Sequence, residues 1–169
     1  MESRAKLFGH AIHPILIAFP LGLLSTALIF DAIYLFTRNG RWADISFWMI
    51  AVGVVGGLAA AVFGLIDLLA IPAGTRAQTI GLWHGGGNIV VVILFGVSWL
   101  LRRDAPDNPE IIAIVLSFTG AGLLLLAGWL GGELVERLGV GVDDGVHLNS
   151  PSSLSGRPAS ENATSTRDT

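Results

Sequence analysis

Hydrophobic positions along this chain fall into four long blocks, unlike the short periodic runs of a water-soluble helix bundle. Four windows contain no Asp, Glu, Lys or Arg: Leu7–Phe30, Ile45–Ile66, Ala77–Leu101 and Ile111–Gly132. A helix that crosses the apolar core of a bilayer needs about 20 residues. Backbone polar groups in that core must be satisfied within the segment, as they are in a helix. The pattern therefore predicts four membrane-spanning helices.

The residues between the windows set the expected helix ends. We predict an all-α, up-down four-helix bundle over residues 8–142, with spans at about 14–36, 46–69, 80–101 and 111–135. Pro14 fits the first turn of the first span, whereas Pro20 predicts a kink that neighbouring helices must enclose. Every tryptophan lies at a predicted span end, as interfacial anchors do. Residues 143–169 are rich in Ser, Thr, Asn, Pro and Gly, which predicts a disordered tail.

Composition supports a membrane protein and excludes several other classes. Charged residues make up 14% of the chain and mean hydropathy is +0.67, whereas soluble domains average about 25% charged residues. A net charge of −3 with no basic stripe argues against nucleic-acid binding. The absence of cysteine excludes disulfides and thiolate ligands. Arg4 and Lys6 precede the first window, but its long apolar run and lack of a cleavage site favour a retained span over a signal peptide.

Alternation of the spans gathers polar residues at one membrane face. The start of the first span, the end of the second, the start of the third and the end of the fourth all lie on this face, which we name side A; the opposite face is side B. Ionisable residues within spans are costly and often mark function. The residues expected at side A are His10, His13, Asp67, His84, Asn88 and Glu133.

Three interpretations of this group remain open. In the first, Asp67, His84 and Asn88 only cross-link helices by hydrogen bonds, as is common in membrane bundles. In the second, His13 and His84 face each other from diagonal helices as axial ligands of a b-type haem, with the glycines at 85–87 making room. Asp67 and Asn88 would then border the cofactor, and Arg76 or Arg137 would meet its propionates. A carboxylate at Asp67 so near the macrocycle argues against this interpretation.

The third interpretation is a small metal site. His13, His84 and Asp67 would supply nitrogen and oxygen ligands, with His10 or Glu133 completing the shell. Such a set suits Zn, Mn or non-haem Fe. A transmembrane proton relay is disfavoured because Asp31 is the only carboxylate near the other end of a span. We expect Asp31 to pair with Arg38 or Arg41 at the side B surface.

Several ordered motifs resemble one known family. These are His13-Pro-Ile-Leu-Ile-Ala-Phe-Pro-Leu-Gly22, Gly64-Leu-Ile-Asp-Leu-Leu69, His84-Gly-Gly-Gly-Asn88, and Leu130-Gly-Gly-Glu-Leu-Val135 followed by Gly139-Val-Gly-Val142. In combination they resemble the "domain of unknown function 2231" family of small bacterial membrane proteins. The resemblance implies a four-helix inner-membrane protein of unassigned role, whose recurrent polar positions include His13, Asp67, His84 and Asn88. Many relatives carry a histidine where this chain has Leu138.

The resemblance also bears on partners and setting. The resemblance implies that some relatives are joined to, or encoded beside, redox modules such as Rieske-type iron–sulfur domains, which favours a redox role. Besides membrane lipid, we expect a membrane redox partner or a homo-oligomer. Side B concentrates its positive charges in two short surface turns, Arg38 and Arg41 in one and Arg102 and Arg103 in the other, so we expect side A, with both termini, to be periplasmic. No nucleophile–base pair or phosphate loop is evident, which favours a non-enzymatic role or an accessory subunit that packs against a partner.

Overall fold

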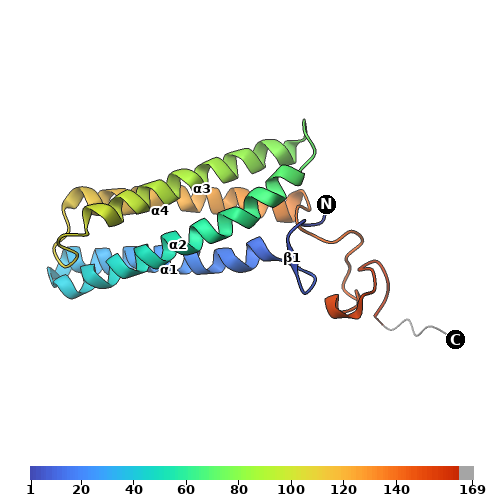
Figure 1. Cartoon of the computed structure of the whole chain (residues 1–169), viewed down its shortest axis with the longest axis horizontal. Coiled ribbons are helices and arrows are strands. Elements are labelled where there is room, and N and C mark those ends of the chain that lie inside the picture. The colour runs from blue at the N-terminus through green and yellow to red at the C-terminus, as the bar shows by residue number, and fades with distance from the viewer. Residues whose placement is uncertain (164–169) are drawn as a thin grey trace.

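The computed structural model describes residues 1–163 of the chain. Its body is four helices in an up-down arrangement: α1 (Ile12–Thr37), α2 (Gly40–Ala70), α3 (Arg76–Leu101) and α4 (Ile111–Gly132). A π-helical turn, η1 (Glu133–Arg137), continues α4. The α1–α2 and α3–α4 turns lie at one end of the bundle, and the N-terminus, the α2–α3 turn and the C-terminal segment lie at the other (Figure 1). The predicted all-α, up-down bundle is confirmed.

All four helices are long and apolar enough to cross a membrane. Their outer surfaces carry large apolar side chains that a water-soluble protein would bury. Leu69 is 77% exposed, Leu125 is 75% exposed and Val55 is 65% exposed. These faces are suited to contact with lipid chains.

Two helices begin earlier than their hydrophobic windows because a polar residue caps them. The side chain of Asn39 accepts a hydrogen bond from Arg41 N, and α2 therefore starts at Gly40 instead of near Ser46. The Thr75 side chain accepts from Gln78 N and starts α3 at Arg76. Side-chain caps satisfy amide groups that the first helical turn leaves unpaired. Pro20 is buried inside α1, as its enclosure by neighbouring helices requires.

The bundle consists of two helical hairpins with matching registers. Packing is closest between α1 and α2 and between α3 and α4. Buried positions of α2 recur in α4 at a constant separation of 67 residues: Ser46 and Ala113, Phe47 and Ile114, Gly53 and Gly120, Ala60 and Ala127. Positions of α1 recur in α3 and its C-cap at a separation of 71, including Leu24 and Phe95, Ala27 and Ser98, and Asp31 and the C-cap Arg102. Each hairpin therefore presents equivalent residues to the shared core.

An N-terminal β-hairpin covers part of side A, which hydropathy did not predict. Strand β1 (Lys6–Leu7) pairs antiparallel with β2 (His10–Ala11). The two residues of its turn, Phe8 and Gly9, both have positive φ angles, of 51° and 80°. Turns with two positive φ angles match the twist of a two-stranded hairpin.

The C-terminal segment packs beside this hairpin. Over residues 143–163 it forms turns and one short 3-10 helix, η2 (Ser153–Ser155). Asp143 forms an ion pair with Lys6, which links the segment to β1. The predicted disorder of residues 143–169 stays a prediction, and its last part, 164–169, lies outside the described residues.

Candidate functional site

His13 lies in the first turn of α1 and reaches across to α2. Its Nδ1 lies 2.9 Å from the carbonyl oxygen of Ala60. A carbonyl oxygen only accepts hydrogen bonds, so Nδ1 carries the proton and Nε2 keeps its lone pair. The ring lies over Gly64, where a Cβ would stand 2.8 Å from the imidazole Cε1. Gly64 therefore makes room for this imidazole.

His84 occupies the equivalent place in the second hairpin. Its Nδ1 lies 2.8 Å from the carbonyl oxygen of Ala127, and its ring lies over Gly131, where a Cβ would stand 3.0 Å from Cε1. This bond fixes the same tautomer as in His13. One turn later, Asn88 places its Nδ2 3.3 Å from His84 Nε2 and donates to the His84 carbonyl oxygen at 2.8 Å.

The two imidazoles meet between the hairpins. Their centroids are 6.3 Å apart and their planes are perpendicular. Both Nδ1 atoms are occupied by backbone carbonyls, which leaves the two Nε2 atoms as the groups with ligand character. The structure thus brings together His13, His84 and Asn88 from the residues that the sequence singled out.

Asp67 is engaged elsewhere, at the N-terminal segment. Ser3 Oγ lies 2.9 Å from each oxygen of its carboxylate, and Arg4 N donates to it at 2.8 Å. Ser3 is itself buried, at 7% exposure. Asp67 therefore anchors the N-terminal segment to the end of α2.

The remaining expected residues lie at the periphery of side A. His10 is exposed on β2. Glu133 accepts a hydrogen bond from Arg76 at 2.6 Å, so this arginine is paired with a protein carboxylate. Within residues 1–163 there is no group of three or more His, Cys, Asp or Glu side chains that could hold a metal ion. The expected metal set of His13, His84 and Asp67 is not assembled in this arrangement.

Charge on side A is concentrated where the N-terminal segment meets residues 143 and 144. Lys6 donates to Asp143 and, at 2.8 Å, to Glu2, and these two bonds hold the pKa of Lys6 above its ordinary value of 10.5. The bond from Lys6 likewise lowers the pKa of Glu2 below 4.5. Both groups therefore stay charged across the neutral range.

A second polar cluster, near side B, was not predicted correctly. We expected Asp31 to pair with Arg38 or Arg41 and Arg102 to lie in a surface turn. Asp31 and Arg102 instead form a pair with no exposed surface, with Nη1–Oδ1 at 2.6 Å and Nη2–Oδ2 at 2.7 Å. Arg102 is the C-cap of α3, and its side chain turns back into the bundle instead of outward.

Hydroxyl and carbonyl groups complete this cluster. Arg102 donates to Ser46 and Ser117 at 3.2 Å each and to the Ala113 carbonyl at 3.4 Å, and Ser117 donates to Asp31 at 2.8 Å. The pair thereby connects all four helices. One sequence signal was available: Asp31 and Arg102 each follow a histidine, His13 or His84, by 18 residues. Opposite charges at equivalent positions of two hairpins are suited to pair across their interface.

Comparison with known proteins supports the membrane assignment. No curated protein and no solved structure matches the chain. A family model described as "Predicted membrane protein (DUF2231)" matches residues 9–144, which takes in all four helices and the histidine pair. The chain therefore belongs to the DUF2231 family of predicted membrane proteins.

Proposed function

We propose that His13 and His84 are axial ligands of a b-type haem, and that the protein transfers electrons to or from a redox partner in the bacterial inner membrane. The observation that carries the proposal is the equivalence of the two imidazoles: each donates from Nδ1 to a helix carbonyl and keeps Nε2 as a ligand atom. A hydrogen bond at the remote nitrogen is the usual support of a ligating histidine.

The spacing of the rings is consistent with ligation of one iron. A metal–nitrogen bond is about 2 Å long and the ring adds about 1 Å to its centroid, so two imidazoles on opposite sides of one ion have centroids about 6 Å apart. In the structure the two ring centroids are 6.3 Å apart. The number of ligands also favours haem. Two imidazoles complete the coordination shell of a haem iron, whereas a bare zinc ion takes three or four protein ligands.

Binding of the macrocycle requires two local changes. The contact between the Asn88 amide and His84 Nε2 must break. The shorter bond from Asn88 to the His84 carbonyl oxygen can remain. Room is most easily made between α1 and α4, which pack less closely than α2 and α3. Arg137 is exposed near this end and is available to a propionate.

A visible spectrum of the full-length protein in mild detergent, as isolated and after addition of haem, tests the proposal. We expect a Soret band that responds to reduction, and its loss in His13→Ala and in His84→Ala. The matched control is His10→Ala, which removes an exposed imidazole on β2 and should leave the spectrum unchanged. A folded wild-type protein with no Soret band after haem addition would refute haem binding. Bound metal without a Soret band would favour a bare ion instead.

One observation favours a second candidate, an accessory subunit in which the polar residues only cross-link helices. Each imidazole is already hydrogen-bonded across its hairpin and packed on a glycine. Interhelical bonds of this kind contribute about 0.6–2 kcal/mol in membrane bundles. For this candidate, His13→Gln and His84→Gln lower stability without any spectroscopic change, and the protein co-purifies with a membrane partner.

A further inference from the structure

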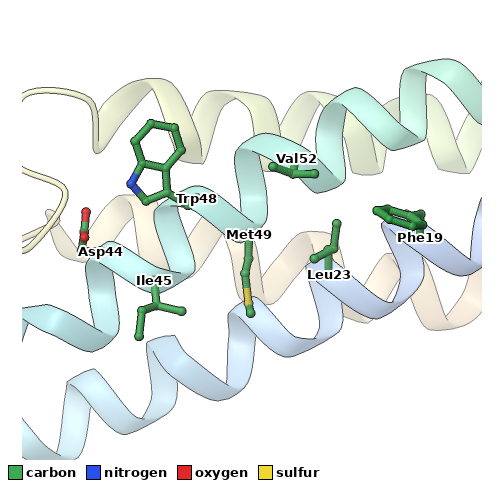
Figure 2. Close-up of a pocket in the computed structure, with 7 residues that line it drawn as sticks. All are labelled: Phe19, Leu23, Asp44, Ile45, Trp48, Met49 and Val52. Carbon is green, nitrogen blue, oxygen red and sulfur yellow. The ribbon is translucent and has the colours of Figure 1, made fainter.

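A lipid-facing groove runs between α1 and α2, away from the histidine pair. It has a volume of about 380 Å³ and is open along one side. Its walls are Phe19 and Leu23 of α1 and Ile45, Trp48, Met49 and Val52 of α2, and Asp44 stands at its side B end (Figure 2). The groove is therefore an apolar channel that ends in a single carboxylate.

The depth of this groove in the membrane follows from helix lengths. α2 has 31 residues and is about 46 Å long, whereas the hydrocarbon core is about 30 Å thick. Its ends therefore project into the headgroup layers. Asp44 is four residues into α2, between Trp42 and Trp48, and tryptophans favour the interface. From Asp44 to Val52 the groove extends about 12 Å toward the membrane centre, a length suited to part of an acyl chain.

The charge at the mouth indicates which headgroup fits. Asp44 is half-buried, and across residues 1–163 its carboxylate has no hydrogen-bond or ion-pair partner. At the mouth of the groove, a carboxylate that is unpaired within this range complements a headgroup that carries an ammonium.

We propose that this groove binds a phospholipid with a primary ammonium headgroup, of the phosphatidylethanolamine class. One acyl chain lies along the apolar walls, and the headgroup lies along the interface so that its ammonium donates hydrogen bonds to Asp44. The trimethylated ammonium of phosphatidylcholine has no N–H to donate to the carboxylate. A phosphatidylglycerol headgroup carries no cation and meets the negative charge of Asp44 without compensation.

Native mass spectrometry of the full-length protein in mild detergent tests this assignment. The protein is equilibrated with an equimolar mixture of phosphatidylethanolamine, phosphatidylcholine and phosphatidylglycerol that have identical acyl chains. We expect phosphatidylethanolamine to be enriched about two- to fivefold among bound lipids, the range of a partly exposed charge pair. Asp44→Asn should remove the enrichment. Glu110→Gln, which makes the same charge change at an exposed side B position outside the groove, should keep it.

A second variant separates the groove from the headgroup contact. Leu23→Trp fills the apolar channel and should lower the number of retained lipids, whatever their headgroup. Equal binding of the three lipids by the wild type, or an unchanged preference in Asp44→Asn, would overturn the proposal. Retention of a non-phospholipid ligand that Leu23→Trp displaces would also overturn it. None of these outcomes depends on haem binding.

Discussion

Replacement of Arg102 by Met should lower the free energy of unfolding by about 3–5 kcal/mol, because it leaves a buried carboxylate without its counter-charge. Methionine keeps the unbranched, flexible shape of the arginine stem and removes every donor. Within the described residues, Asp31 would then be fully buried with only the Ser117 hydroxyl as a hydrogen-bond partner. Asp31→Leu should cost a similar amount, because the guanidinium loses both short bonds and keeps only contacts of 3.2–3.4 Å.

The double variant distinguishes the net stabilisation that the ion pair provides from the destabilisation that follows when only one partner is removed. Buried ion pairs gain Coulomb energy but lose hydration, and their replacement by apolar residues of similar volume is often neutral or stabilising. The pair here also leaves Arg102 Nε buried without a partner within the described residues. We therefore expect Asp31→Leu with Arg102→Met to cost less than either single change, with a coupling energy of about 2 kcal/mol or more.

The equivalence of the two hairpins gives a further variant of the same test. Asp31→Arg combined with Arg102→Asp places the charges in reversed order at positions 71 residues apart. The swap should recover part of the stability lost in each single change. Recovery should be incomplete because Ser46, Ser117 and the Ala113 carbonyl are placed for an arginine at position 102.

Equilibrium unfolding in mixed micelles of mild detergent and dodecyl sulfate, followed by tryptophan fluorescence, provides the measurement. Thr119→Val, which removes an exposed intrahelical hydroxyl bond, serves as the control for a polar change on α4. Single variants at Asp31 and Arg102 that each cost less than about 1 kcal/mol would contradict the cost expected for breaking a buried pair. Additive costs in the double variant would show that the two groups do not interact.

Two further results are expected. Gly64→Ala and Gly131→Ala should each displace an imidazole and cost about 1–3 kcal/mol of stability, whereas Gly122→Ala, which meets open space, should be neutral or stabilising in the same unfolding assay. Protection factors for amide hydrogen exchange in the N-terminal hairpin, which correct for the intrinsic pH dependence of exchange, should be highest from about pH 5 to pH 10. The pKa of Glu2 is lowered from 4.5, so its stabilising contribution is lost as the pH falls through that lowered value. The pKa of Lys6 is raised from 10.5, so its contribution is lost as the pH rises through that raised value. Protection factors at pH 3 equal to those at neutral pH would contradict these contacts.

For the candidate site, sequence and structure contributed different parts. Alternation of four apolar blocks was enough to predict that His13, His84 and Asn88 lie at one end of the bundle, since up-down connectivity fixes the end at which each residue lies. The alternation of blocks could not show that Asp67 contacts a different part of the molecule from His13, His84 and Asn88. That carboxylate lies at the same level, but Ser3 and the Arg4 amide hold it at the N-terminal segment. Such short polar contacts depend on how a segment of low hydropathy folds back, and hydropathy carries no information about them.

The sequence by itself determined the number of helices, their alternation and their apolar character, because a bilayer imposes segment length and apolarity on the chain. Only the tertiary structure decided the partners of polar groups inside the bundle. Arg102 follows the last apolar residue of its window, as an interfacial arginine does, and its hydropathy did not indicate that its side chain turns inward to Asp31. The tautomers of His13 and His84 were likewise set by carbonyls of Ala60 and Ala127, 47 and 43 residues away in the chain. Hydrophobicity is a local property of the sequence, whereas these partners are selected by the register between helices.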